Sequence, residues 1–200
     1  MRSRLWAWVG AAFVVNLFLA AAIVLALGTD THGIGIALRV TARVSFFWFW
    51  AAYTGGALTT LFGAAFLPLK QHGRELGLAF AAALSVHLAL VAWLCWMGVV
   101  PQAGVFIFFG TAAALTFVLA IFSFGDFHAM LGPKGWRLLR IIAMNFVLYA
   151  FLKDFMHEPL HGGVVRVMEY LPFVIMAIAA LLLQFAAWAI RLRVSFKNAG

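Results

Sequence analysis

The chain has 200 residues, of which 66% are hydrophobic and only 10% are charged, and its mean hydropathy is +1.05. This composition excludes a soluble domain, which needs far more polar surface, and the continuous apolar runs exclude a β-barrel, whose strands alternate between apolar and polar residues. The formal net charge of +8 comes from basic residues scattered between the apolar runs, so nucleic acid is not expected as a partner.

Apolar stretches of about 20 residues predict membrane-spanning helices, because a helix of that length crosses the hydrocarbon core of a bilayer. The sequence has six such stretches, at residues 5–27, 44–67, 76–98, 104–124, 137–156 and 167–190. The expected fold class is therefore an all-α integral membrane protein, a six-transmembrane-helix bundle in which residues 1–200 form a single transmembrane domain.

The breaks between the first three stretches are predicted from glycine and proline. Residues 5–27 are too long for the apolar region of a signal peptide, about 7–15 residues, so they are expected to be the first span. Gly28, Gly33 and Gly35 predict a loop that continues to the second span at residue 44. Pro68 is expected to end the second helix.

Small and uncharged polar residues within the stretches predict contacts between helices. Ala52, Gly56, Thr60 and Ala64 recur every four residues in the second stretch, and this spacing allows close approach of another helix. Asn145 and Gln184, in the fifth and sixth stretches, are expected to form hydrogen bonds between helices.

The distribution of Lys and Arg predicts the orientation. On the side that holds both termini, the 2–3 loop and the 4–5 loop, there are ten basic residues, and the other side has four: Arg39, Arg43, Lys153 and Arg166. Because cytoplasmic segments are enriched in Lys and Arg, both termini are expected in the cytoplasm. The expected location is the bacterial inner membrane, in multi-pass form.

His87 is the one histidine deep inside a predicted span, and ionisable residues there are functional candidates. It could be a haem ligand, because small Ala79 and Ala83 on the same face would leave room for a flat cofactor. It could equally form a hydrogen bond to a neighbouring helix. The residues alone leave both roles open.

Two further groups lie near the ends of spans. Lys153 is near the outer end of the fifth stretch, where it could extend to the membrane surface beside Asp154. His157 and His161 are four residues apart and could share a metal ion, although Pro159 is expected to interrupt the helix and no third ligand is evident.

Three segments carry a resemblance to a known family: LRVTARVS (Leu38 to Ser45), GRELGLAFA followed by His87, and LGPKGWRLLR (Leu131 to Arg140). In their order and spacing the chain, from about residue 36 to the sixth span, resembles the ferric reductase-like transmembrane domain family. That family includes the haem-binding membrane subunit of the bacterial periplasmic methionine sulfoxide reductase system. The resemblance implies transmembrane electron transfer through b-type haem held by paired histidines.

The four positions that correspond to haem ligands read Arg74, His87, Arg140 and Lys153 in this chain. Arginine stays protonated and cannot ligate iron. Lysine can ligate only after it loses its proton. The resemblance therefore implies one haem at most, held by His87 with Lys153 or by His87 alone. If the cofactor has been lost, Arg74 and Arg140 are expected to face lipid phosphates.

Two functions follow as hypotheses. In the first, the protein is a b-haem membrane electron-transfer subunit with a degenerate haem site, which acts with a membrane or periplasmic partner. In the second, it is a structural or assembly subunit of a larger membrane complex, without haem. It is not expected to be a stand-alone enzyme, because it has no nucleotide-binding fingerprint and is at most the membrane redox subunit of an oxidoreductase. Transport is disfavoured because no acidic residue lies deep within a span.

Overall fold

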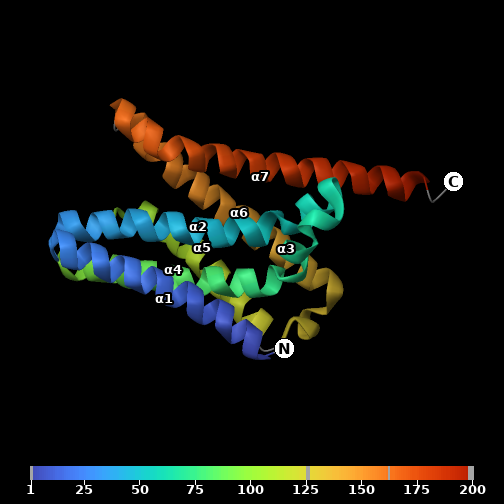
Figure 1. Cartoon of the computed structure of the whole chain (residues 1–200), viewed down its shortest axis with the longest axis horizontal. Helices are drawn as coiled ribbons and strands as arrows, with labels where there is room; N and C mark the ends of the chain where they lie inside the picture. The colour runs from blue at the N-terminus through green and yellow to red at the C-terminus, as the bar shows by residue number, and fades with distance from the viewer. Residues whose placement is uncertain (1, 125–126, 162, 198–200) are drawn as a thin grey trace. The chain divides into compact units, whose positions relative to one another are not determined.

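A computed structural model describes residues 2–124, 127–161 and 163–197, with side chains for residues 5–124, 127, 129–157, 164–165 and 167–193. All elements within these residues are helices, as the apolar runs predicted. In chain order they are α1 (Arg2–Leu27), α2 (Thr31–Phe62), η1 (Gly63–Phe66), α3 (Leu67–Gln71), α4 (Gly73–Trp96), α5 (Ala103–Phe124), η2 (Phe127–Leu131), α6 (Gly132–His161) and α7 (Gly163–Lys197) (Figure 1).

Within the described residues, five helical segments are long and apolar enough to cross a membrane: Leu5–Leu27, Thr31–Gln71, Gly73–Trp96, Ala103–Phe124 and Val167–Arg193. They contain five of the six predicted spans. Their mean hydropathies range from 1.2 for Thr31–Gln71 to 2.5 for Leu5–Leu27 and Ala103–Phe124. The chain is thus an α-helical protein of the multi-pass membrane type.

The predicted span at residues 137–156 lies within helix α6 but is not among these five segments. Charged residues stand near both ends of its apolar part, with Arg140 before it and Lys153 after it. The uncharged residues 141–152 between them rise about 18 Å as a helix, whereas the hydrocarbon core is about 30 Å thick. The helix is confirmed, and its role as a sixth span stays a prediction.

The predicted loop between the first two spans is wrong, because α2 begins at Thr31 instead of residue 44. The Asp30 carboxylate accepts a hydrogen bond from the backbone N–H of Gly33, 2.9 Å away, and so caps the start of the helix. Gly33 and Gly35 lie inside the helix rather than in a loop. Ile34 and Ala37, three residues apart, are fully buried, so this first part of α2 has a core-facing side.

The second helix also ends before Pro68, the residue predicted to end it. Helix α2 stops at Phe62, and Gly63 follows with a φ of 76°, a left-handed conformation that favours glycine. Pro68 instead lies in the first turn of α3, where its missing N–H costs no intrahelical bond. A Cβ at Gly55 would lie 2.9 Å from the Leu69 carbonyl, so glycine permits the close approach of α3 to α2.

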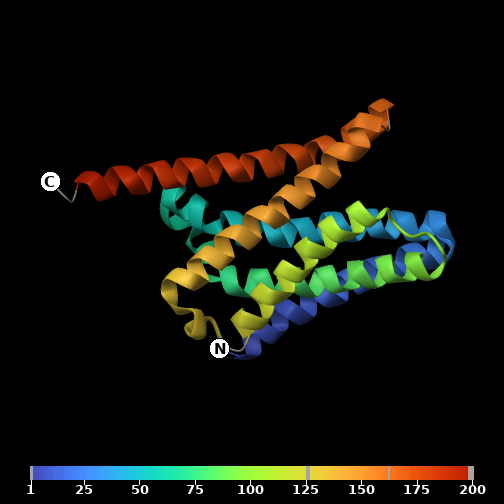
Figure 2. The ribbon, with the colours of Figure 1, turned by 180° about the vertical axis from the view of Figure 1, so that it is seen from behind.

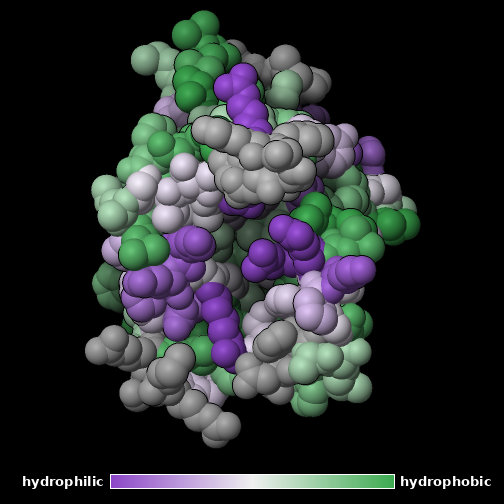
Figure 3. Space-filling view, turned by 90° about the vertical axis from the view of Figure 1, so that its right-hand side faces the viewer, coloured by the Kyte–Doolittle hydropathy of each residue, from purple (hydrophilic) through white to green (hydrophobic). Residues whose placement is uncertain are grey.

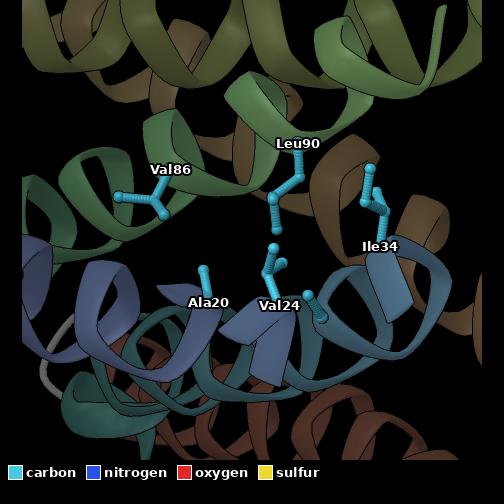
Figure 4. Packing of buried hydrophobic residues seen from close by; sticks show 6 residues of the cluster. Ala20, Val24, Ile34, Val86 and Leu90 are labelled. Carbon is cyan, nitrogen blue, oxygen red and sulfur yellow. The ribbon is translucent and has the colours of Figure 1, made fainter. Parts of the chain in front are cut away.

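The helices form two compact units. The first contains Met1–Phe49 and Glu75–Ala150, which include α1, the first part of α2, α4, α5 and the first part of α6. One buried cluster joins three of these helices: Ala20 and Val24 of α1, Ile34 and Ala37 of α2, and Val86 and Leu90 of α4. Figure 4 shows Val86 and Leu90 pointing from α4 toward Ala20 and Val24.

Aromatic rings join α5 to α6 within the first unit. The Phe108 ring centroid lies 5.3 Å from that of Phe146 and 5.6 Å from that of Tyr149. Figure 2 shows α5 and the first part of α6 running side by side. Such aromatic pairs favour edge and tilted geometries, as found here.

The second unit contains Trp50–Arg74 and Phe151–Gly200, which include the second part of α2, η1, α3, the end of α6 and α7. The indole Nε1 of Trp50 donates to the Met176 carbonyl oxygen at 2.9 Å, which joins α2 to α7. Phe155 is fully buried and its ring lies 5.3 Å from that of Phe173, which joins α6 to α7.

Large hydrophobic side chains are exposed on most helices, as expected of surfaces that face lipid. Phe18 of α1 is 70% exposed and Ile107 of α5 is 67% exposed. Figure 3 shows such green, hydrophobic side chains at the surface beside purple, hydrophilic ones. The apolar helices therefore present a surface suited to contact with a bilayer.

Candidate functional site

His87 lies on α4 within the first unit, where it contacts α2. Its Nδ1 atom is 3.1 Å from the hydroxyl oxygen of Thr41, a fully buried residue of α2. The same hydroxyl lies 2.9 Å from the Ala37 carbonyl oxygen of its own helix. One arrangement satisfies these groups: Thr41 donates its single proton to Ala37, and His87 Nδ1–H donates to Thr41 Oγ1. His87 therefore links α4 to α2.

Two more polar side chains lie in the same three-helix core. Asn16 of α1 is fully buried, and it lies four residues from both Ala12 and Ala20, which contact α4. Ser45 of α2 is also fully buried, one turn beyond Thr41. We refer to Asn16, Thr41, Ser45 and His87 as the polar layer, because they lie on the faces of α1, α2 and α4 that pack together.

The polar layer contains two atoms that the protein leaves without a hydrogen bond. The Asn16 Oδ1 and Ser45 Oγ atoms are buried and have no partner among the described residues. The Asn16 amide nitrogen is 3.5 Å from the Ala12 carbonyl oxygen, a long contact within its own helix. Buried polar atoms without partners are uncommon in proteins, so the layer differs in chemistry from the apolar core around it.

The space expected next to His87 is occupied. Ala79 and Ala83 are fully buried, each with 0% solvent exposure. They form a cluster with Ala12 of α1 and the partly buried Trp48 of α2. These alanines therefore pack against α1 and α2 instead of lining an open space, and the haem role of His87 stays a prediction. Their small side chains instead let α1 approach α4 closely.

Two of the four positions that correspond to haem ligands, Arg140 and Lys153, lie on helix α6. Arg140 is exposed near the start of α6, and Lys153 is exposed on the same helix. His87 belongs to the first unit and Lys153 to the second, so their shared haem stays a prediction. Since arginine cannot ligate iron, Lys153 is the one of these two residues that could pair with His87.

The predicted metal pair is described only in part. His157 is exposed on α6, whereas the side chains of Glu158 and His161 lie outside the described residues. The backbone of α6 continues to His161, so the predicted interruption at Pro159 is wrong. Among the side chains that are described, no group of three or more His, Cys, Asp or Glu residues could hold a metal ion.

The predicted bond between helices at Gln184 is confirmed. Its Nε2 atom donates to the Tyr53 carbonyl oxygen at 2.6 Å, which joins α7 to α2 within the second unit. The small-residue stripe of α2 also contacts α7, because Arg191 Nη2 lies 3.1 Å from the Thr60 hydroxyl. Asn145 donates to the Ile141 carbonyl oxygen in its own helix, and its bond to another helix stays a prediction.

Sequence reasoning missed three of the four residues of the polar layer. The signal was present, because Asn16 is the only amide in the first apolar stretch, and Thr41 and Ser45 are four residues apart and thus on one helix face. Polar side chains within spans usually face other helices rather than lipid. The assumed loop before residue 44 hid Thr41.

A comparison of the chain with models of protein families, with curated proteins and with solved structures finds no match. The resemblance to the ferric reductase-like transmembrane domain family therefore stays a prediction from the sequence segments that carry it.

Proposed function

We propose that this protein is a non-catalytic structural subunit embedded in a membrane, which packs against other membrane proteins. The observation that supports this function is the contact between His87 and Thr41. The one histidine deep in an apolar helix holds two helices together, and the small residues beside it pack against α1. His87, the residue of this core most suited to binding a cofactor, thus joins two helices, and the small residues beside it serve helix packing.

A wide apolar surface supports the same proposal. In the most hydrophobic part of Ala103–Phe124, only 11% of the residues are buried within the chain. Phe106 and Ile121 on this helix are 55% and 60% exposed. A helix with so few contacts inside its own chain has a surface free to meet lipid or a helix of a partner protein.

The proposal includes six spans, with both termini in the cytoplasm of a bacterium. Helix α6 supplies the sixth span, because the long side chains of Arg140 and Lys153 can extend from the ends of its apolar part toward the two membrane surfaces. The ratio of ten basic residues to four between the two sides supports this orientation. Arg39 and Arg43, two of the four basic residues on the side with fewer of them, lie within helix α2 instead of in the predicted loop.

A second candidate function, a single b-type haem for electron transfer, is favoured by one observation. The contact of His87 with Thr41 uses Nδ1, and histidine can bind iron through its other ring nitrogen, Nε2. When bound, haem would supply one-electron transfer across the membrane. The occupied space beside Ala83 opposes this candidate.

The visible spectrum of the purified protein separates the two candidates. We expect a protein produced with sufficient haem to show no b-type band in a reduced-minus-oxidised spectrum. His87→Ala and the matched control His32→Ala, at an exposed position of α2, should then give identical spectra. A b-type band that is lost in His87→Ala and retained in His32→Ala would overturn the structural proposal in favour of the haem protein.

Association with a partner is tested in native membranes. The tagged chain, extracted in a mild detergent, should migrate in native electrophoresis as a complex much larger than a 21.9 kDa protein in its detergent micelle. Deletion of the chain should lower the amount of the same partner subunit. Migration as a monomer in every mild detergent, with no partner affected by the deletion, would contradict the proposal.

A further inference from the structure

The start of α6 forms an open groove in the first unit. Its volume is about 680 Å³, and it is lined by Ala129, Gly132, Pro133, Trp136, Arg137 and Arg140. Pro133, Trp136, Arg137 and Arg140 follow the spacing i, i+3, i+4, i+7, so one face of the helix provides most of the wall. Ala129, from η2, provides another part of it.

The groove is positively charged. The guanidinium groups of Arg137 and Arg140 are both on exposed residues, and neither forms an ion pair with a described residue. The described residues of η2 and of the first three turns of α6 include no acid, and the nearest acid in the sequence, Asp126, lies outside the described residues.

The position of the groove along α6 matches the surface of a bilayer. The two arginines directly precede the uncharged residues 141–152, and Trp136 lies beside them. Tryptophan is enriched where the hydrocarbon core meets the headgroups, and arginine at that level meets phosphate. Two guanidinium groups one turn apart on a helix can each donate two parallel hydrogen bonds to phosphate oxygens.

We propose that this groove binds a phosphate group, that of an anionic phospholipid headgroup. Arg137 and Arg140 hold the phosphate, Trp136 packs against the glycerol and the upper acyl chain, and Gly132 and Pro133 form the wall at the end of the helix. The site uses no residue of the polar layer, but its level in the membrane rests on the proposed function, in which α6 is the sixth span and Arg140 lies at its end.

The test measures the thermal stability of the purified protein with added lipid. A ligand that binds only the folded state raises the midpoint of unfolding. Anionic phosphatidylglycerol should raise it more than zwitterionic phosphatidylcholine does, and R137Q/R140Q should lose most of this difference. Affinity for phosphatidylglycerol should fall by at least about tenfold, since several hydrogen bonds between charged groups are lost.

The matched control is K70Q/R193Q, which removes the same charge at two exposed positions of the second unit. It should retain the effect of phosphatidylglycerol. In a second experiment, inorganic phosphate is added instead of lipid, and it should change the midpoint of unfolding little. A shift equal to that caused by phosphatidylglycerol would show that free phosphate is the ligand and would overturn the lipid assignment.

An unchanged lipid effect in R137Q/R140Q, or an equal loss in K70Q/R193Q, would overturn the site. If R137Q/R140Q does not fold, R137K/R140K provides the same test, because lysine retains the charge and lacks the planar fork that binds two oxygens. This variant should lose part of the difference between the two lipids, and full retention would overturn the proposed role of the guanidinium groups.

Discussion

The polar contacts between helices differ between the two compact units. In the first unit, a side chain on each helix takes part, His87 on α4 and Thr41 on α2. In the second unit, the part-buried donors Trp50 and Gln184 use backbone carbonyl oxygens of the opposite helix, and the bond between two side chains, from Arg191 to Thr60, is exposed. Every backbone carbonyl in a helix has a second lone pair that can accept a bond from another helix. A bond between two side chains instead needs a suitable residue at the matching position of each helix.

This difference gives the two units different requirements. For its part-buried contacts, the second unit needs a suitable donor on only one helix. The first unit needs matched residues on α2 and α4, and it also buries Asn16 Oδ1 and Ser45 Oγ without partners among the described residues. Packing of small residues holds α1 against α4 at the same place. We therefore expect stability in the first unit to depend mainly on shape, and in the second unit on single hydrogen bonds.

The largest effect is expected from Ala83→Leu in the first unit. Ala83 is fully buried against Ala12 and Trp48, so a larger side chain forces α1 away from α4. Overpacking of this kind typically costs about 1–3 kcal/mol. The measurement is the free energy of unfolding in a mild detergent, compared with Ala89→Leu at an exposed position of the same helix.

The control should remain close to the wild type in stability. If Ala83→Leu were equally stable, the face beside His87 would have room that the packing does not show, and a flat cofactor there would again be reasonable. This substitution therefore tests both the comparison of the units and the close packing that opposes a haem beside Ala83.

A smaller effect is expected from Gln184→Leu in the second unit. The variant loses the 2.6 Å hydrogen bond to the Tyr53 carbonyl oxygen, which keeps the bond within its own helix. Hydrogen bonds between membrane helices contribute about 0.6 kcal/mol on average and at most about 1.7 kcal/mol. The same unfolding measurement should show a loss in that range. Gln102→Leu, at an exposed position outside the helices, should show none.

A loss far above this range at Gln184 would mean that the second unit, like the first, depends on a side-chain network at this level. The comparison between the units would then fail, because the carbonyl contact would not be a single replaceable bond.

Much of the fold follows from the sequence because apolar length determines it. The predicted stretch at residues 76–98 is α4 from Gly73 to Trp96, and the stretch at 104–124 is α5 from Ala103 to Phe124. The start of α2 could not be predicted from hydropathy, since His32, Gly33 and Gly35 resemble a loop. The helix forms there because Asp30 caps it and because Ile34 and Ala37 are buried against α1 and α4.

The candidate site was predicted less well than the fold. His87 stood out because a histidine is rare in an apolar helix, but its partner depends on which face of another helix lies opposite. That information is in the packing of Ala12, Ala83 and Trp48 rather than in any local pattern. The bond of Gln184 was easier to predict, because a buried amide finds a carbonyl on almost any neighbouring helix.

The smallest effect, and the one whose sign matters most, is expected from Asn16→Leu. Leucine has the same number and branching of side-chain heavy atoms as asparagine and needs no hydrogen bond, whereas Asn16 buries an amide with one unpartnered oxygen and one long contact. Burial of an amide without compensation costs about 1–3 kcal/mol in proteins, and its replacement by an apolar group of the same shape is often neutral or stabilising. The variant should be at least as stable as the wild type in the unfolding measurement.

Asn145→Leu, on an exposed position of α6, controls for the general effect of adding an apolar side chain in detergent. A clear loss of stability in Asn16→Leu, absent from Asn145→Leu, would mean that the Asn16 oxygen has a partner in the membrane. Ser45→Ala should then show the same loss, because the second unpartnered oxygen lies on the neighbouring helix of the same core. In that case the polar layer binds a small hydrogen-bond donor and is more than a packing device, and the contrast with the second unit becomes one of function as well as of stability.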